Sequence, residues 1–357
     1  MPSPRKLLPY VLAELQARES WKSRDYEAAK TQAARAAAQA LEADDRSAWW
    51  NMVYLQAECL RDEGTIPECM ELARRLTEDR LSHEFPSLAA RAYTLLAISQ
   101  QGLGRLPEAV TAATIAAEAI AGDSEYVYLH VEAQRALIAA LAESRLLDDA
   151  WTQSLLLESL LTELVDEDTA GKAYWVIGNV AFLSGRLHEG GHYHDLAAER
   201  LSPSRDVDLW ARFNRASAVM RLEAELADPA TLRCIERAEL ATEVVGGSRR
   251  DLLEMSFARA HWHYLTGDMP TAISILGPLC AESGILAAQT AAEATFLLGK
   301  SLLAQGEKPD AIQRFEDAAA LFDDAAASER SAQVRAFAAS VSAPVQPPVH
   351  TPDAGRP

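Results

Sequence analysis

The stretch Phe296-Leu-Leu-Gly-Lys-Ser-Leu-Leu-Ala-Gln-Gly-Glu-Lys-Pro-Asp-Ala-Ile-Gln-Arg-Phe315 decides the fold. It contains Gly306 and, three residues later, Pro309. A glycine that ends one helix in the left-handed conformation, followed by a proline in the first turn of the next, is typical of a tight turn between two helices. Beyond this turn, apolar residues recur at steps of three and four, as on the buried face of a helix: Ile312, Phe315, Ala318, Ala319 and Phe322. The stretch therefore predicts a helical hairpin.

The same punctuation recurs along the chain with a period of about 40 residues. Five prolines carry the period at spacings of 40, 122, 41 and 39 residues, where 122 is three periods: Pro67, Pro107, Pro229, Pro270 and Pro309. Steps of the same length also reach Glu27, Asp148 and His188, and each of these opens another apolar-periodic stretch. We therefore predict eight repeats whose second helices begin near residues 27, 67, 107, 148, 188, 229, 270 and 309.

Two further features keep this register. Two residues after each predicted start lies a small residue, as close contact between helices requires: Ala29, Cys69, Ala109, Ala150, Gly190, Thr231, Ala272 and Ala311. Three residues before five of the starts lies a glycine: Gly64, Gly104, Gly185, Gly267 and Gly306. Each repeat is therefore predicted to be helix, tight turn, helix.

These residues resemble the tetratricopeptide repeat. The segments Ala173–Leu187 and Phe296–Phe315 carry its pattern, with a small residue at Gly178 or Gly299 and a turn glycine seven residues later. The period of about 40 is longer than the family's usual 34, and Glu225-Leu-Ala-Asp-Pro interrupts the turn of the sixth repeat. The resemblance implies an all-α, right-handed solenoid of about eight hairpins. Such longer helices are similar to those in the sensor halves of bacterial helix-turn-helix/tetratricopeptide regulators, but the first repeat begins near Pro9 and leaves no room for the DNA-reading domain.

The predicted organisation has three parts. Residues 1–8 form a lead, residues 9–340 form the solenoid, and residues 341–357 form a proline-rich tail that cannot bury enough apolar surface to order itself. Within the solenoid, Ser328–Ala339 is predicted to be a polar-faced helix that caps the last repeat.

Composition narrows the classes of partner. The 357 residues carry a net charge of −18, so the average field repels nucleic-acid backbones. No apolar run reaches the roughly 18 to 20 residues of a membrane helix, so we expect a cytoplasmic protein with neither direct nucleic-acid nor membrane binding. The four cysteines stand singly, which predicts neither disulfides nor a thiolate zinc site.

One motif points to catalysis. His188-Glu189-Gly190-Gly191-His192 matches the H-E-x-x-H pattern, in which two imidazoles on one helix face bind zinc and the glutamate activates water. The extended form of the pattern has a glycine three residues on and a third histidine ligand six residues on, but this chain has Asp195 and Ala198 there. The repeat register also explains the segment as the start of a second helix. A zinc metallopeptidase is therefore a remote alternative, no metal or cofactor is predicted, and His194 is expected on the exposed helix surface beside His192.

The resemblance implies a binding groove lined by the first helix of each hairpin. It places the groove face at Asn179, with Trp175 and Phe182 one turn to either side, and Asn214 with Trp210 repeats the spacing. An asparagine can donate and accept hydrogen bonds toward an extended peptide backbone, so the two Trp–Asn pairs are expected to form a ladder. The other candidate ligand-binding residues are Arg135, His261, Tyr264 and Lys300, accompanied by Phe257 and Phe296. The alternative is that Trp175 and Trp210 belong to the core between repeats.

The sequence favours a non-catalytic adaptor or scaffold that holds a peptide or protein segment in this groove. A regulatory sensor that responds to a peptide or another ligand and acts on a partner in trans is the alternative. Self-association into a homo-oligomer stays open. The identity of the ligand is not encoded in any motif of the chain.

Overall fold

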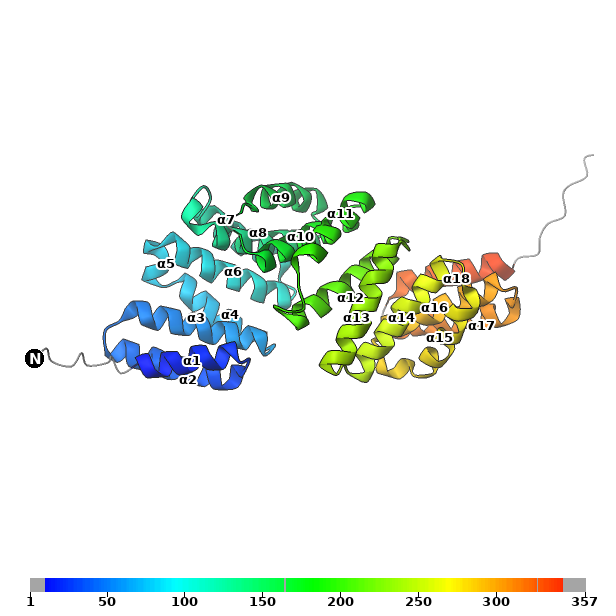
Figure 1. The fold of residues 1–357 in the computed structure, drawn as a ribbon, viewed down its shortest axis with the longest axis horizontal. Coiled ribbons are helices and arrows are strands. Elements are labelled where there is room, and N and C mark those ends of the chain that lie inside the picture. Colours follow the sequence, from blue (N-terminus) through cyan, green and yellow to red (C-terminus); the bar gives the residue numbers. More distant parts are fainter. Residues whose placement is uncertain (1–9, 164, 326, 343–357) are drawn as a thin grey trace, which may run out of the picture. The chain divides into compact units, whose positions relative to one another are not determined.

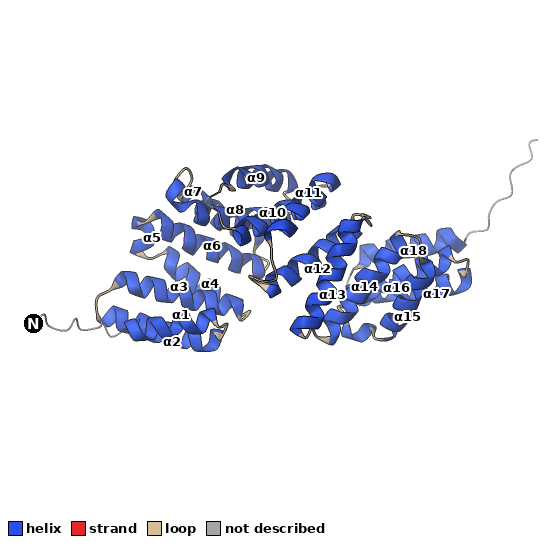
Figure 2. Ribbon diagram, viewed as in Figure 1, coloured by secondary structure: helices blue, strands red, loops and turns tan. Residues whose placement is uncertain are grey.

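A computed structural model describes residues 10–163, 165–325 and 327–342 (Figures 1 and 2). Helices joined by short turns make up these ranges, which contain no strand. The predicted all-α fold is therefore confirmed. No helix in the described ranges is both long and apolar enough to cross a membrane.

The described chain forms eight successive helical hairpins, as predicted. They pair α1 (Val11–Lys22) with α2 (Tyr26–Glu42), α3 (Arg46–Asp62) with α4 (Ile66–Thr77), α6 (Pro86–Gly102) with α7 (Leu106–Ala119), α8 (Val127–Glu143) with α9 (Leu147–Leu160), α10 (Glu167–Leu183) with α11 (Leu187–Arg200), α12 (Val207–Glu223) with α13 (Pro229–Val245), α14 (Arg249–Leu265) with α15 (Met269–Ala281), and α16 (Ala288–Ala304) with α17 (Lys308–Asp324). The short helix α5 (Arg80–Glu84) and two 3-10 turns, Ser124–Tyr126 and Ser283–Ile285, lie between hairpins.

The predicted register of the second helices is confirmed. Each of them begins at the predicted residue or one residue before it. The eight small residues that follow these starts are all buried: Ala29, Cys69, Ala109, Ala150, Gly190, Thr231, Ala272 and Ala311. A small side chain at this point lets the two helices of a hairpin approach closely.

In each of the eight hairpins, the turn between the two helices contains one residue with a positive φ angle, in the left-handed conformation. The five predicted glycines have φ values between 71° and 87°. Where glycine is missing, Arg24, Arg145 and Glu225 adopt the same conformation at φ 61°, 62° and 57°. The next residue then donates to a carbonyl five residues earlier, as Leu146 N does to Leu141 O at 3.0 Å. The turn geometry is thus kept even where its usual residue is absent.

The interrupted turn of the sixth repeat is accommodated by a helix cap. After the left-handed Glu225, the chain continues to Asp228, whose side chain accepts from Thr231 N at 2.8 Å. Pro229 then occupies the first position of α13, where a missing N–H costs nothing.

The chain divides into two compact units, Met1–Ser202 and Pro203–Pro357. In the N-terminal unit the core includes Leu95, Ile138 and Ile177. In the C-terminal unit it includes Leu276 and Phe315. Both cores consist of side chains shared between successive hairpins, as expected for stacked repeats.

The helix α18 (Ser328–Ser342) follows the last hairpin at the predicted place. It buries Val334, and its Ser331 Oγ donates to Ala319 O on α17 at 2.9 Å. The predicted lead 1–8, and the predicted tail 341–357 apart from its first two residues, lie outside the described residues. The three-part division of the chain stays a prediction.

The left-handed turns make a prediction about stability. Arg145 is exposed and has φ 62°, a conformation that costs an L-residue about 1 to 2 kcal/mol. Arg145→Gly should therefore stabilise the α8–α9 hairpin by about 0.5 to 1 kcal/mol. Hydrogen–deuterium exchange of α8 and α9, with a thermal melt, measures this. Arg145→Ala is the control and should change little, whereas faster exchange in Arg145→Gly would contradict the argument.

Candidate functional site

Seven first helices share one length and one register. The helices α3, α6, α8, α10, α12, α14 and α16 each contain 17 residues. Equivalent residues can therefore be compared by their position in the helix, where the first residue is position 1. Position 9 is Tyr54, Thr94, Arg135, Trp175, Arg215, Phe257 and Phe296, and position 13 is Glu58, Ile98, Ala139, Asn179, Val219, His261 and Lys300.

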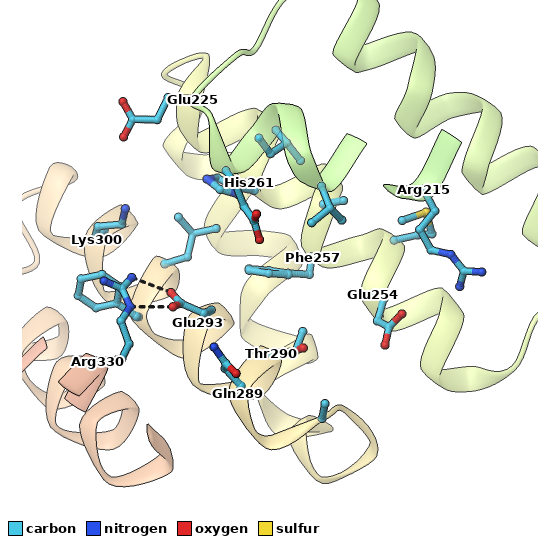
Figure 3. Close-up of a pocket in the computed structure, with 18 residues that line it drawn as sticks. Arg215, Glu225, Glu254, Phe257, His261, Gln289, Thr290, Glu293, Lys300 and Arg330 are labelled. Atoms are coloured by element: carbon cyan, nitrogen blue, oxygen red, sulfur yellow. Dashed lines mark hydrogen bonds and ion pairs between the residues drawn. The ribbon is translucent and has the colours of Figure 1, made fainter. Parts of the chain in front are cut away.

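A large pocket lies at these positions in the C-terminal unit (Figure 3). Its volume is about 710 Å³, and it is lined by α12, α14 and α16 together with the start of α18. Its walls contain positions 9 and 13 of all three first helices, including Val219, Phe257, His261, Phe296 and Lys300. We call this cavity the C-unit pocket. The shared register makes the same helix face line the cavity in three successive repeats.

Aromatic rings form much of the wall. Phe257 and His261 stack with ring centroids 6.1 Å apart on α14. Lys300 Nζ lies 4.7 Å from the Tyr264 ring and 5.4 Å from the Phe296 ring. The guanidinium of Arg330, which belongs to α18, lies 5.3 Å from the same Phe296 ring. The pocket therefore combines flat apolar surface with cations held over it.

Two arginines of the pocket are held by carboxylates. Arg330 Nε and Nη2 donate to the two oxygens of Glu293 at 2.7 and 2.9 Å, as the dashed lines of Figure 3 show. Arg215 Nη1 donates to Asp251 Oδ1 at 2.5 Å. These ion pairs fix the charged side chains around the cavity.

Burial changes the protonation of the remaining basic groups. It lowers the pKa of His261 to about 4, with a further contribution from the positive charge of Lys300. Burial and then the charge of Arg330 lower the pKa of the Lys300 ammonium. His261 is therefore a neutral imidazole near pH 7 and offers one donor and one acceptor.

The N-terminal unit has a smaller cavity on the same helix face. Its volume is about 230 Å³, and Tyr54, Glu58 and Arg91 are among the residues that line it. Arg91 lies 4.1 Å from the Tyr54 ring and donates to Asn51 Oδ1 at 3.2 Å. Burial raises the pKa of the Glu58 carboxyl. The cavity is below the roughly 300 Å³ at which small-molecule pockets begin, so it has room for one side chain rather than a segment.

The structure brings together part of the predicted site. His261 and Lys300 line the C-unit pocket, and Tyr264 contacts Lys300 from beside it. Arg135 lies in the N-terminal unit, where Nη1 donates to Glu132 Oε1 at 2.6 Å. Trp175 and Asn179 take positions 9 and 13 of α10 and are half-buried. Neither cavity described above includes them.

The side chain of Asn179 contacts α11, the second helix of its own hairpin. His194 of α11 is 1% exposed, so the expectation that it lies on the helix surface is wrong. Its Nε2 lies 3.1 Å from Asn179 Oδ1. The imidazole fits there because position 178 is glycine: a Cβ on Gly178 would lie 2.2 Å from His194 Cδ2. The other end of the predicted cluster, Phe182, is buried with its ring 5.0 Å from that of His194.

The predicted Trp–Asn ladder needs correction. Trp210 and Asn214 are positions 4 and 8 of α12, whereas Trp175 and Asn179 are positions 9 and 13 of α10. A shift of five residues turns a side chain by about 140° around the helix axis. Asn214 is accordingly 0% exposed, and its Nδ2 donates to Trp210 O at 2.7 Å. Trp210 is also buried, and the groove positions of α12 belong to Arg215 and Val219 instead.

The H-E-x-x-H segment begins a second helix. His188 and His192 are exposed on α11, while Gly190 packs against the Phe182 ring, which a Cβ would approach to 2.8 Å. Among the described residues, no group of three His, Cys, Asp or Glu side chains is arranged to hold a metal ion. The observed contacts of the segment are those of the repeat.

Sequence reasoning missed Arg215, Val219, Glu293 and Arg330, which also line the pocket. Three of them could have been found by counting from the helix starts, because they lie at positions 9, 13 and 6 of their helices. Arg330 belongs to α18, which the sequence predicted as a cap and not as part of a site. Its pairing with Glu293 depends on how the cap packs.

Among known proteins, this chain is similar to solved structures in its fold but matches none in sequence. No protein-family model and no curated protein sequence matches the chain. One similar solved structure is the heterotetramer Cut9–Hcn1 of the APC/C, at TM-score 0.57 and 12% identity, covering 94% of this chain and 57% of that one. A second is aspartyl phosphate phosphatase F from Bacillus subtilis, at TM-score 0.53 and 13% identity, covering 76% and 69%. A third is a Rap protein complexed with competence and sporulation factor, at TM-score 0.52 and 12% identity, covering 93% and 98%. These similarities confirm the predicted tetratricopeptide-type helical repeat fold.

The contact between His194 and Gly178 makes a prediction about the fifth hairpin. Gly178→Ala should destabilise it by about 1 to 3 kcal/mol, because the new methyl group would overlap the imidazole. Gly191→Ala is the matched control on α11, where a Cβ meets no atom within 4 Å. This control should stabilise the helix by up to about 1 kcal/mol. Thermal melts of both variants measure the difference, and equal effects would contradict the packing argument.

Proposed function

We propose that this chain is a non-catalytic protein-binding protein that holds an extended peptide segment in the C-unit pocket. The observation that carries the proposal is the pocket itself. It has a volume of about 710 Å³ and repeats the same two helix positions on α12, α14 and α16. A segment crossing these helices would meet equivalent side chains at each step.

The chemistry of the wall supports a peptide as the ligand. Phe257 and Phe296 provide the aromatic surface on which peptide side chains bury apolar area. The paired charges Arg330–Glu293 and Arg215–Asp251 surround this surface, like the polar rim of a protein interface. Their carboxylates and guanidiniums are engaged with each other, which suits recognition better than acid–base chemistry.

Two of the similar structures add support from what their names say. One is a Rap protein complexed with competence and sporulation factor, and the other is the Cut9–Hcn1 heterotetramer. Both helical-repeat proteins are thus seen with a bound partner. The phosphatase named in the third similar structure is 13% identical to this chain, and we do not extend its activity to this protein.

A ligand-responsive regulatory sensor is the second candidate. It is favoured by the similarity to the Rap complex over 93% of this chain and 98% of that one. The two candidates differ in what binding does to the chain. A sensor changes its conformation when the peptide binds, whereas an adaptor keeps it, so small-angle X-ray scattering with and without bound peptide separates them.

The half-buried pair Trp175 and Asn179 stays a prediction as a second contact surface. Asn179 keeps its amide nitrogen for a ligand if His194 donates to its oxygen. The pair lies in the N-terminal unit, so it can be tested separately from the C-unit pocket.

The proposed function predicts that filling the pocket blocks peptide binding. Val219 is 40% exposed in the pocket wall, and Val219→Trp should fill part of the cavity without disturbing the core. Peptides are first selected on the wild-type protein from a random linear library displayed with free C-termini. Their affinity for Val219→Trp, measured by calorimetry, should fall at least about tenfold, which is about 1.4 kcal/mol.

The matched control is Leu240→Trp. Leu240 is 55% exposed on α13, the second helix of the same hairpin, and does not line the pocket. This variant should bind the selected peptides like the wild type. Failure of the library to yield any peptide, or equal binding by Val219→Trp, would refute the proposal.

A further inference from the structure

We propose that the C-unit pocket recognises a carboxylate of its peptide ligand and that Lys300 is the residue that contacts this group. The inference rests on the proposed function, because it names the chemistry of the segment that the pocket holds. It follows from the state of the charged groups around the cavity.

Lys300 differs from the two arginines of the pocket. Arg330 is paired with Glu293, and Arg215 is paired with Asp251. Among the described residues, no carboxylate lies within ion-pair distance of Lys300 Nζ, which lies over the Tyr264 and Phe296 rings. Glu225 and Glu293 act on its charge only from farther away. A half-buried ammonium without a carboxylate partner is costly, and an anion from a ligand would compensate its charge.

The neighbouring helix supplies a second polar group. His261 occupies position 13 of α14, and Lys300 occupies position 13 of α16. Because burial keeps the imidazole neutral, it can donate one hydrogen bond without a charge of its own. Figure 3 shows both side chains at the wall of the same cavity. A carboxylate has two oxygens, so it can accept from both groups.

The same row of residues sets a direction for the ligand. At position 13 the wall changes from the apolar Val219 on α12, through His261 on α14, to the cation Lys300 on α16. Packed helices lie about 8 to 10 Å apart, so the row spans about 18 Å, or about five extended residues. We infer that the ligand places an apolar side chain near α12 and its carboxylate near α16.

A carboxylate fits this environment better than a phosphate does. The wall also contains Glu223, Glu225 and Glu254, whose negative charges repel any anion. A phosphate group carries a charge of about −1.5 to −2 near pH 7, so this repulsion is larger for phosphate than for a monoanion. The lone ammonium of Lys300 is matched in charge by a single carboxylate.

In the N-terminal cavity, by contrast, both cationic side chains donate hydrogen bonds to neighbouring side chains. Arg61 Nε donates to Asp62 Oδ1 at 2.8 Å, and Arg91 is held by Asn51 and the Tyr54 ring. Its only cations among the residues that line it are these two, and both already have partners. The two cavities thus differ in that both cations of the N-terminal cavity donate to an oxygen, although Arg91, like Lys300, has no carboxylate at ion-pair distance.

Lysine-specific nuclear magnetic resonance tests the inference directly. The chain has six lysines, so the ε-carbon signal of Lys300 can be assigned by comparison with Lys300→Met. Two carboxylate probes represent the two sources of the group: N-acetylphenylalanine for a peptide C-terminus, and N-acetylglutamic acid α-amide for an acidic side chain. The corresponding uncharged amides are the matched ligands.

At least one carboxylate probe should shift the Lys300 signal saturably, and its amide should bind at least about tenfold more weakly. Lys300→Met should weaken binding of that probe by a similar factor. Lys308→Met, an exposed lysine at the start of α17, is the control and should bind like the wild type. The better of the two probes identifies the source of the carboxylate.

The inference is overturned if neither carboxylate shifts Lys300 up to its solubility limit, or if an amide binds as well as its acid. A folded Lys300→Met that keeps full affinity, with an unchanged thermal melt, would overturn it as well. Selected peptides that need an open pocket but not Lys300 would leave the proposed function standing without this inference. Carboxylate binding at Lys300 without any selected peptide would refute the proposed function alone.

Discussion

Close approach of two helices at one small residue governs every hairpin of this chain. At the start of each second helix the buried side chain is alanine, cysteine, threonine or glycine. Where the first helix also has glycine, a large side chain from the second helix fills the gap, as His194 does over Gly178 and Phe315 does over Gly299. Volume lost on one helix is regained on the other, which keeps the interior close-packed.

That contact also fixes the rotation of each first helix. Once one face packs against the second helix, the residues about 140° away are committed to another environment. Positions 9 and 13 therefore line both cavities, although their residues range from Tyr54 and Glu58 to Phe296 and Lys300. The scaffold determines where a cavity-lining side chain lies, and the sequence at these positions determines its chemistry.

The fold could be predicted because its signals are local. Glycine in a left-handed turn, proline in a first turn and a small residue two positions later each report on a few neighbouring residues. The site was predicted only in part. His261 and Lys300, named from the sequence as candidates, do line the C-unit pocket, and their role in binding stays a prediction. Asn214 was assigned to the groove on its spacing from Trp210, and that spacing is identical on any face of a helix. Only a count from the helix start distinguishes the faces, and the pairing of Arg330 with Glu293 requires tertiary packing that no local pattern encodes.

The net charge of the chain governs its interaction with a large polyanion, whereas the side chains of the C-unit pocket govern its interaction with a single bound group. A chain with a net charge of −18 repels a polyanion, because many negative groups approach its surface at once. At physiological ionic strength, however, charges more than about 8 Å apart in solvent are largely screened. A single carboxylate inside the C-unit pocket would therefore respond mainly to the groups that line it. Among these, Lys300 is the cation that has no carboxylate at ion-pair distance in the described structure, whereas Glu293 and Asp251 pair with the two arginines. The strongly acidic composition disfavours nucleic acid as a partner and is compatible with selection of one acidic group.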